Sequence, residues 1–282
     1  MARTWFITGC SSGFGEAIAK AARALGDNVV ATSREAAKLG DLAQIGAYTV
    51  SLDVNSPQKD IDALVAEAVN KYGSIDILVN NAGYILEGGV EEVSDEEVRA
   101  QFDTNVFGQL AVTRAVLPYM RAKKSGVIAN MGSIAGWRGG INCGMYCSAK
   151  FALIGITEAL RKEVEPLGIT VVAIEPGYFR TNFLSGGHKV SPKKTIDDLV
   201  PVIKPVKDMF AMYNHQQPGD PLKGAQLIVE ALTGTGRCAD KRLPARLAIG
   251  TDAVAMISEV LEDKKKELDD WKDLAITTDL AA

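Results

Sequence analysis

The chain has 282 residues, of which 47% are hydrophobic and 23% are charged, and its formal net charge is −4. This length suits one large α/β domain, and its dispersed lysines and arginines lack the clustering typical of a nucleic-acid surface. No uncharged apolar stretch approaches the roughly 20 residues of a membrane-spanning helix, and the N-terminus lacks the features of a signal peptide. We therefore expect a cytoplasmic protein with no nucleic-acid or membrane partner.

Short runs rich in Val and Ile alternate with helical patterns along the chain. The predicted strands cover residues 4–8, 28–33, 47–54, 75–80, 126–131, 169–175 and 243–249. The predicted helices cover residues 16–25, 60–72, 94–121, 146–167, 223–232 and 253–268, and Ser94 with Glu97 predicts a capping box. This alternation indicates a Rossmann-like, doubly wound parallel sheet in three αβα layers. We expect a single domain over residues 1–282 that ends in a loosely held tail at 270–282.

A glycine-rich segment, TGCSSGFG at 8–15, joins the first predicted strand to the first predicted helix. Such a turn brings backbone amides at a helix N-terminus close to a phosphate. It therefore predicts a dinucleotide site. The loop residues expected to contact the cofactor are Gly9, Ser11, Ser12, Gly13, Phe14 and Gly15.

The second predicted strand ends in Ser33 and Arg34. A carboxylate at this point would bind the adenosine ribose and favour NAD, whereas a cation would meet a 2′-phosphate. We therefore predict NADP(H) as the cofactor, with a solvated arginine at a strand end as the alternative. The further residues expected beside the cofactor follow the third and fourth strands: Asp53, Val54, Asn81, Ala82 and Gly83.

Tyr146 and Lys150 lie four residues apart in a predicted helix, with Ser133 thirteen residues before the tyrosine. Positions i and i+4 share a helix face, so the ammonium can lie near the phenol. A tyrosine side chain has a pKa of about 10, and a nearby cation lowers that pKa because it stabilises the phenolate. Lowering the pKa to neutrality would require roughly 4 kcal/mol of such stabilisation. The pattern predicts a proton-transferring tyrosine, although by itself it also fits a tyrosine and a lysine on a solvated helix.

Residues 184–222 interrupt the alternation and mix Gly, Pro and Lys with apolar residues between Leu199 and Tyr213. This composition predicts a substrate lid with an apolar underside, and a surface insertion is the alternative. The apolar residues suggest a lipophilic substrate. Further candidates for the pocket wall are Ile141, Phe183, Leu184 and Trp137, the last with simple packing as its alternative role.

The four cysteines, Cys10, Cys143, Cys147 and Cys238, show no metal-ligand spacing, and the two histidines lie in a polar, proline-bearing region. We therefore expect no metal site. Cys143 and Cys147 could face one another across a helical turn. Reduced bystander thiols are the expected state in a cytosolic protein.

Together these motifs resemble the single-domain branch of the short-chain dehydrogenase/reductase family. The matching pieces are TGCSSGFG at 8–15, DV at 53–54, NNAG at 80–83, Asn105 in DTNVFG, Ser133 in MGSIAG, YCSAK at 146–150 and PGYFRT at 176–181. They occur in the family's order and at its approximate spacings. The loop and the NNAGY segment are most similar to the subgroup near the 17β-hydroxysteroid and retinol dehydrogenases.

The resemblance implies an oxidoreductase that interconverts a ketone or aldehyde and an alcohol. Tyr146 would exchange the proton with the carbonyl oxygen, Ser133 would orient that oxygen, and Lys150 would lower the tyrosine pKa and bind the nicotinamide ribose. Asn105 would hold a water that links Lys150 to solvent. The residues implied to line the nicotinamide are Pro176, Gly177, Phe179 and Thr181.

Two alternatives to simple carbonyl reduction remain at this point. One is a regulator that binds the cofactor without turnover, and the other is a redox step inside an epimerisation or tailoring reaction. The intact set of Asn105, Ser133, Tyr146 and Lys150 favours an active enzyme. The resemblance also implies a homodimer or homotetramer formed through the predicted helices 94–121 and 146–167.

Overall fold

The computed structural model of the chain describes residues 2–185 and 187–280. Within them, seven parallel strands form one sheet in the order β3-β2-β1-β4-β6-β7-β9. The strands are β1 (Thr4–Ile7), β2 (Asn28–Ser33), β3 (Tyr48–Ser51), β4 (Ile77–Asn80), β6 (Gly126–Met131), β7 (Ile169–Pro176) and β9 (Arg246–Ile249). The predicted Rossmann-like parallel sheet is confirmed.

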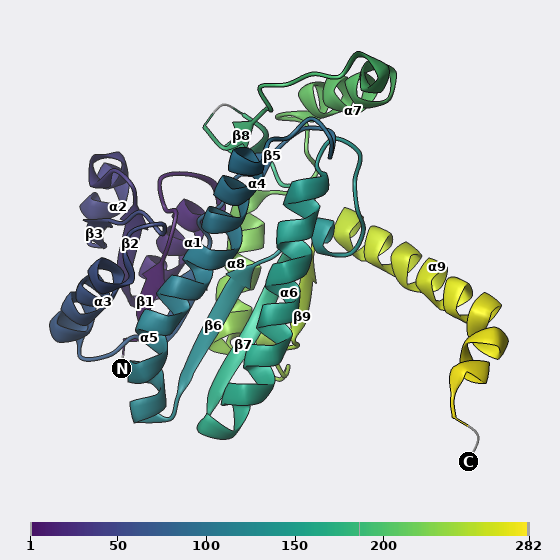
Figure 1. Cartoon of the computed structure of the whole chain (residues 1–282). Coiled ribbons are helices and arrows are strands. Elements are labelled where there is room, and N and C mark those ends of the chain that lie inside the picture. The colour runs from purple at the N-terminus through teal and green to yellow at the C-terminus, as the bar shows by residue number, and fades with distance from the viewer. Residues whose placement is uncertain (1, 186, 281–282) are drawn as a thin grey trace.

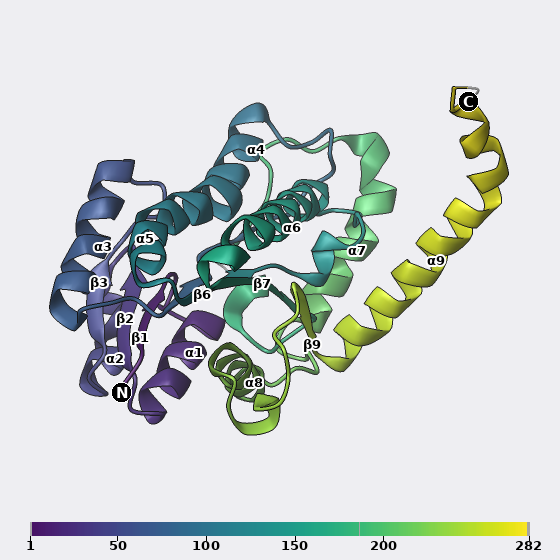
Figure 2. The same ribbon diagram turned by 90° about the horizontal axis from the view of Figure 1, so that it is seen from below.

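Helices cover both faces of the sheet, as Figures 1 and 2 show. On one face lie α1 (Gly13–Ala24), α2 (Gly40–Gln44) and α8 (Pro221–Thr233). On the other lie α3 (Gln58–Tyr72), α5 (Gln109–Lys123) and α6 (Gly144–Val164). The result is the predicted three-layer αβα arrangement.

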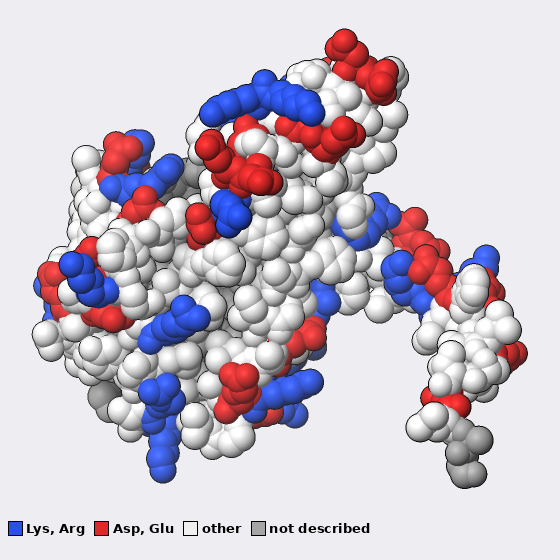
Figure 3. All heavy atoms as spheres, in the orientation of Figure 1, with Lys and Arg blue, Asp and Glu red and all other residues white. Residues whose placement is uncertain are grey.

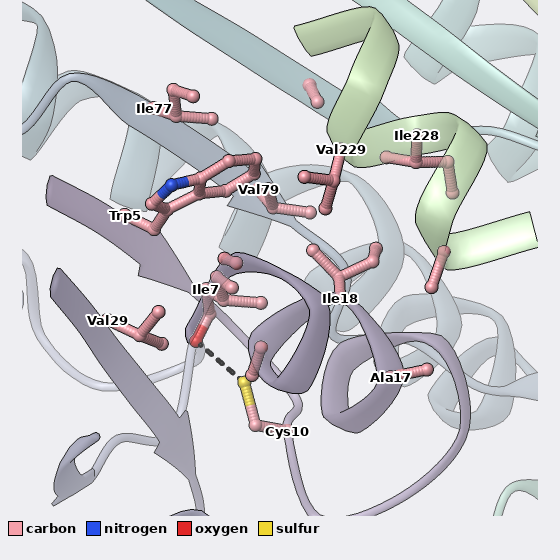
Figure 4. Packing of buried hydrophobic residues seen from close by; sticks show 14 of the residues in the cluster. Trp5, Ile7, Cys10, Ala17, Ile18, Val29, Ile77, Val79, Ile228 and Val229 are labelled. Atoms are coloured by element: carbon pink, nitrogen blue, oxygen red, sulfur yellow. Dashed lines mark hydrogen bonds between the residues drawn. The ribbon is translucent and has the colours of Figure 1, made fainter. Parts of the chain in front are cut away.

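Each strand contributes to two hydrophobic cores, because successive side chains point to opposite faces of a sheet. Trp5 and Ile7 of β1 belong to the core under α1 and α8, whereas Phe6 belongs to the core under α3 and α5. Figure 4 shows the first core, in which Trp5 and Ile7 of β1 belong to one cluster with Ile18 of α1 and Ile228 of α8. Burial on both faces explains why the strands read as continuous apolar runs.

The single helix predicted for residues 94–121 is wrong. The structure divides it into α4 (Asp95–Phe102), a π-helical turn (Asp103–Gly108) and α5. The predicted capping box is confirmed, because the backbone amide of Glu97 donates to Ser94 Oγ and that of Ser94 donates to Glu97 Oε2. An added Cβ at Gly108 would lie 2.7 Å from the Val54 side chain. The turn is thus pressed against the loop after β3, a contact that helical periodicity does not reveal.

The last helix, α9 (Thr251–Ala275), is longer than the predicted span of 253–268, so the predicted tail at 270–282 begins as helix. Residues 281–282 of that tail lie outside the described residues. Ala253, Ile257 and Val260 are buried, and beyond them the helix leads away from the body (Figures 1 and 2). Ion pairs one turn apart, such as Lys265 with Asp269, support the exposed part.

The segment predicted as a lid contains β8 (Lys189–Val190) and α7 (Val200–Tyr213). β8 pairs with β5 (Ile85–Leu86), which follows β4 in the chain, and Lys189 Nζ lies 3.4 Å from Glu87 Oε2. Phe210 is the buried residue of α7, whereas three of its apolar side chains are more than half exposed: Val202, Met209 and Met212. The apolar underside predicted for this segment is therefore largely solvent-facing. No helix among the described residues has the length and apolarity needed to cross a membrane.

Buried amides and hydroxyls join the sheet to α5 and α6. Asn80 Nδ2 donates to Thr113 Oγ1 and to Asn130 Oδ1, both at 2.8 Å, and Asn130 Nδ2 donates to Thr157 Oγ1 at 2.9 Å. Each threonine hydroxyl in turn donates to the carbonyl one turn earlier in its helix. Hydrogen bonds between buried groups hold their geometry tightly, because a broken one leaves a polar atom without water. This network therefore fixes α6 against β6.

We predict that Thr157→Val lowers the free energy of unfolding by about 1–3 kcal/mol, because the buried amide of Asn130 loses its acceptor while the volume is kept. Urea unfolding followed by circular dichroism measures this difference. Thr157→Ser, which keeps the hydroxyl, is the matched control and should lose less. Equal losses in the two variants would show that packing, and not the hydrogen bond, holds α6 here.

Candidate active site

The carboxyl ends of β1, β4, β6 and β7 meet at one edge of the sheet and border a cavity of about 540 Å³. From β1 the strand order proceeds outward in both directions, so this edge contains the topological switch point where ligands bind in such sheets. Every predicted cofactor residue except Gly15 lines the cavity, as do Ser133, Tyr146 and Lys150. Side chains spread over 170 residues of sequence are thus brought together.

The glycine-rich loop fits a phosphate group. Gly9 and Gly13 have positive φ angles of 70° and 61°, a region that other residues adopt at a cost. Gly15 lies behind the loop, where an added Cβ would fall 2.3 Å from the Gly9 carbonyl oxygen. Ser12 caps α1 without a side-chain hydrogen bond to the helix. The first amides of α1 therefore remain available to an anion in the cavity.

Asn81 holds this loop from the neighbouring strand end. Its Nδ2 donates to the carbonyl oxygens of Thr8 and Gly9, at 2.9 and 3.0 Å. The Thr8 hydroxyl oxygen accepts from the backbone amides of Asn81 and Ala82, both at 3.0 Å. The amide of Asn81, predicted to contact the cofactor, thus serves first to shape the loop that would carry the phosphates.

Arg34 lies exposed at the rim of the cavity, at the end of β2. The adjacent carboxylate, Glu35, is engaged by Lys38 Nζ at 2.6 Å, and that hydrogen bond lowers the Glu35 pKa. Among the described residues, no carboxylate lies within salt-bridge distance of Arg34. Its guanidinium is therefore free to pair with an anionic group of a ligand at this end.

Ser133, Tyr146 and Lys150 form a cluster at the centre of the cavity wall. Ser133 follows β6 and its Oγ accepts the Ala135 amide at 3.1 Å, while the other two lie one turn apart at the start of α6. Tyr146 is 7% exposed and Lys150 is 5% exposed. Lys150 Nζ donates to the Met131 carbonyl oxygen at 2.6 Å and lies 5.6 Å from the centroid of the Tyr146 ring.

Burial shifts the pKa values of both titratable groups in this cluster. Burial raises the pKa of Tyr146 above its ordinary value, and a hydrogen bond with Ser133 opposes that rise. Burial also lowers the pKa of Lys150 to about 8. The ammonium of Lys150 donates to the Met131 carbonyl oxygen. The lowering of the Tyr146 pKa by Lys150 stays a prediction.

Asn105 is fully buried in the π-helical turn and does not line the cavity. Its Nδ2 donates to the Tyr84 carbonyl oxygen at 2.8 Å, and its Oδ1 accepts the Tyr84 amide at 3.1 Å. Both polar atoms of the Asn105 side chain thus hold the backbone of Tyr84, the residue that precedes β5. The predicted role of Asn105 in holding a water near Lys150 stays a prediction.

Among the cavity residues that sequence patterns did not indicate, two carry polar side chains from the segment predicted as a lid, His188 and Gln217. His188 Nε2 lies 3.0 Å from Ser12 Oγ in a hydrogen bond between the predicted lid and the glycine-rich loop. Gln217 is 1% exposed, and its Oε1 has no hydrogen-bond partner among the described residues. The rarity of histidine in this chain was the one signal that could have drawn attention to His188.

Of the candidate wall residues, Phe183 and Leu184 line the cavity and Ile141 and Trp137 do not. Ile141 is 54% exposed. Trp137 Nε1 donates to Glu175 Oε2 at 3.0 Å beneath the guanidinium of Arg246, so its role is packing. No cluster of three or more metal-ligating side chains occurs in residues 2–185 and 187–280.

A family model described as short chain dehydrogenase matches residues 3–189 of the chain. The chain belongs to this family. It is therefore an oxidoreductase of a family that binds a nicotinamide cofactor.

Similar proteins span the whole chain. Oxidoreductase BOA17 of Botryotinia fuckeliana is 32% identical over 282 residues, covering 99% of this chain and 100% of that protein. The crystal structure of a short-chain dehydrogenase from Streptomyces avermitilis has a TM-score of 0.89 and 37% identity, covering 99% of this chain and 100% of that one. The 3-ketoacyl-(acyl-carrier-protein) reductase of Brucella melitensis, complexed with NADH, has a TM-score of 0.72 and 28% identity, covering 88% of this chain and 96% of that one.

The pKa of Lys150 makes stability depend on pH. The folded protein loses the lysine proton near pH 8, whereas the unfolded chain keeps it to about 10.5, so the unfolded state binds more protons between these values. Lysine burial therefore costs most below pH 8, and the free energy of unfolding rises as the pH rises through this window. We predict that the stability of Lys150→Met relative to the wild type falls by about 2 kcal/mol from pH 7 to pH 10.

Urea unfolding of both proteins at the two pH values measures this difference, and other titrating groups cancel in the comparison. Lys162→Met, on the exposed side of the same helix, is the control and should show the same relative stability at both pH values. A relative stability of Lys150→Met that does not change with pH would contradict the buried, weakly basic lysine.

Proposed function

We propose that the protein is an NADP-dependent oxidoreductase that interconverts a ketone or aldehyde and an alcohol on a lipophilic small molecule. The proposal is carried by the Tyr146 side chain, which lies with Ser133 in the wall of the same cavity that the glycine-rich loop lines. A hydroxyl in this position reaches a ligand that shares the cavity with a dinucleotide. This position supports a role for Tyr146 in general acid–base catalysis.

In the reducing direction Tyr146 donates its proton to the carbonyl oxygen of the substrate. Because burial raises its pKa, the phenol is protonated at neutral pH and begins as the acid. Ser133 hydrogen-bonds the same oxygen and holds it in line with the phenol. Lys150, whose ammonium donates to the Met131 carbonyl oxygen, lies one turn from Tyr146 on the same helix face. As a cation there it would stabilise the phenolate that remains once the proton has left. The bound nicotinamide supplies the hydride.

The far part of the cavity supports a lipophilic substrate. The Phe183 ring lies 5.9 Å from the Tyr146 ring, and Tyr178 lies 6.5 Å from Phe210, centroid to centroid. These aromatic groups surround the reacting position with apolar surface, and the Gln217 amide adds one polar contact. The exposed apolar side chains of α7 support a lid that closes over such a substrate and buries them.

A homodimer or homotetramer formed through α5 and α6 is consistent with their outer surface. Phe107, in the turn before α5, is 56% exposed, and Phe151 of α6 is 47% exposed. Figure 3 shows charges of both signs spread over the molecule and a largely uncharged area over these two helices. Light scattering coupled to size-exclusion chromatography measures the assembly.

We predict that Tyr146→Phe lowers kcat for NADPH-dependent reduction by about 10²- to 10⁴-fold, because the ring stays in place and only the transferable proton is lost. Oxidation of NADPH with a panel of lipophilic ketones and aldehydes measures turnover. Fluorescence titration with NADPH, expected to be little changed, shows that the site is intact. A variant that retains full turnover would remove Tyr146 from the chemistry.

We predict that Arg34→Glu raises the KM for NADPH by about 10- to 100-fold, because a charge-assisted contact to the 2′-phosphate is lost and a carboxylate faces it. The KM for NADH, which lacks that phosphate, should stay the same or fall. Arg34→Lys is the conservative control and should keep most of the preference. A wild-type protein with a lower KM for NADH than for NADPH would overturn the assignment of the cofactor.

A further inference from the structure

Two of the four cysteines flank the proposed catalytic tyrosine. Cys143 is the residue that precedes α6, and Cys147 lies in the first turn of that helix. Their sulfur atoms are 3.7 Å apart in a buried thiol–thiol contact. Cys143 also lines the cavity, so the pair is joined to the space that holds the substrate.

The two thiols share one hydrogen bond and differ in acidity. The contact with Cys143 lowers the pKa of Cys147, and a backbone hydrogen bond from Gly140 adds to that effect. The same contact raises the pKa of Cys143, together with its burial and the charge of Glu87. The contact therefore favours a thiolate on one member of the pair, with the other thiol as its hydrogen-bond donor.

We propose that Cys143 and Cys147 form a reversible oxidation site, in which a peroxide converts the dithiol to a disulfide that disables Tyr146. A thiolate takes oxygen from the peroxide, giving a sulfenic acid and hydroxide. The second thiol then attacks the sulfenic sulfur, the S–S bond forms, and water leaves. In sum, two thiols lose two electrons and two protons, and one hydrogen peroxide becomes two waters.

Closing this bond must move the start of α6. The S–S bond is about 2 Å long, so the sulfurs must approach well within their present distance. Residues i and i+4 of a regular helix have Cβ atoms about 5–6 Å apart, more than a disulfide permits. Cys143 has non-helical backbone angles (φ −149°, ψ 27°), so adjustment is possible there. The turn that tightens is the one that carries Tyr146.

The movement also reaches the rest of the cavity. Cys143 forms an isolated β-bridge with Gly88, and the Gly88 amide donates to the Asn142 carbonyl oxygen at 2.8 Å. Gly88 lies two residues after β5, the strand that pairs with β8 of the predicted lid. The disulfide therefore displaces the tyrosine and one lid support together. Formation of the bond is independent of the proposed function, and only the resulting loss of activity depends on it.

The reduced full chain is treated with hydrogen peroxide and then denatured in the presence of N-ethylmaleimide, which alkylates any remaining free thiol. The digested protein is analysed by mass spectrometry. Trypsin releases both cysteines in one peptide, residues 139–150, because Arg138 and Lys150 bound it. We expect this peptide to be lighter by two hydrogens and to carry no alkyl label. Cys10 and Cys238 should be labelled as before, since each is buried apart from this pair.

Activity with NADPH and a carbonyl substrate is measured in parallel, each variant against its own untreated rate. We expect a loss of about 10-fold or more in the wild type and in Cys238→Ser, reversed by dithiothreitol, because small displacements of a reacting group are costly. Cys143→Ser and Cys147→Ser should show no reversible loss.

Two labelled thiols in peptide 139–150 after peroxide, or irreversible overoxidation of either, would overturn the oxidation site. A disulfide that forms without changing the rate would overturn the control of Tyr146. A disulfide in a chain that reduces no carbonyl compound would uphold the oxidation site and count against the proposed function instead.

Discussion

The Asn81 side chain determines whether the glycine-rich loop can exist in its observed form. Asn81 Nδ2 donates to two carbonyl oxygens of that loop. In the other direction, the Thr8 hydroxyl oxygen accepts from the backbone amides of Asn81 and Ala82 after β4. These hydrogen bonds are possible because β1 and β4 are parallel neighbours whose carboxyl ends lie together. It leaves no room for a side chain at Gly15. The loop polar groups are thus satisfied on the protein side, while the amides that begin α1 face the cavity.

In the cluster of Ser133, Tyr146 and Lys150, burial of the last two side chains lowers the stability of the fold. A phenol and an amine are removed from water at the start of α6, and each has its pKa shifted toward the neutral form. Their desolvation is useful, because charges and dipoles interact more strongly in such a site. The hydrogen bonds from Asn130 to Thr157 hold the same helix two turns further on. We infer that this network offsets part of the cost and keeps the cluster in register with β6.

Sequence patterns identified most of the fold and of the cavity, for physical reasons that differ by region. Strands buried on both faces are visible as apolar runs, and residues after parallel strands converge on one edge, so the loop and the Tyr146 cluster could be placed together. The spacing of Tyr146 and Lys150 predicted a shared helix face correctly. The spacing could not show that the Lys150 ammonium would donate to the Met131 carbonyl oxygen, because that hydrogen bond joins residues far apart in the chain.

Most of the failures share this long-range origin, and the length of α9 is the exception. The break at residues 103–108 follows from packing against the loop after β3, while the helical periodicity continues through it. His188 and Gln217 enter the cavity from a segment whose sequence shows no regular pattern. The continuation of α9 past residue 268 reflects local charge pairs, since little of that part packs on the body.

The attachment of residues 184–222 links the two halves of the cavity. Its first part is held at two points, by the pairing of β8 with β5 and by the contact of His188 with Ser12. Both anchors border the cavity, because Ser12 lies in the glycine-rich loop and Ile85 of β5 lines the wall. A ligand held by that loop would therefore also act on the position of this segment. α7 has far less buried surface, with Phe210 as its buried residue. The two parts of the segment are therefore held unequally: its first part is fixed to the cavity wall, whereas α7 is attached mainly through Phe210.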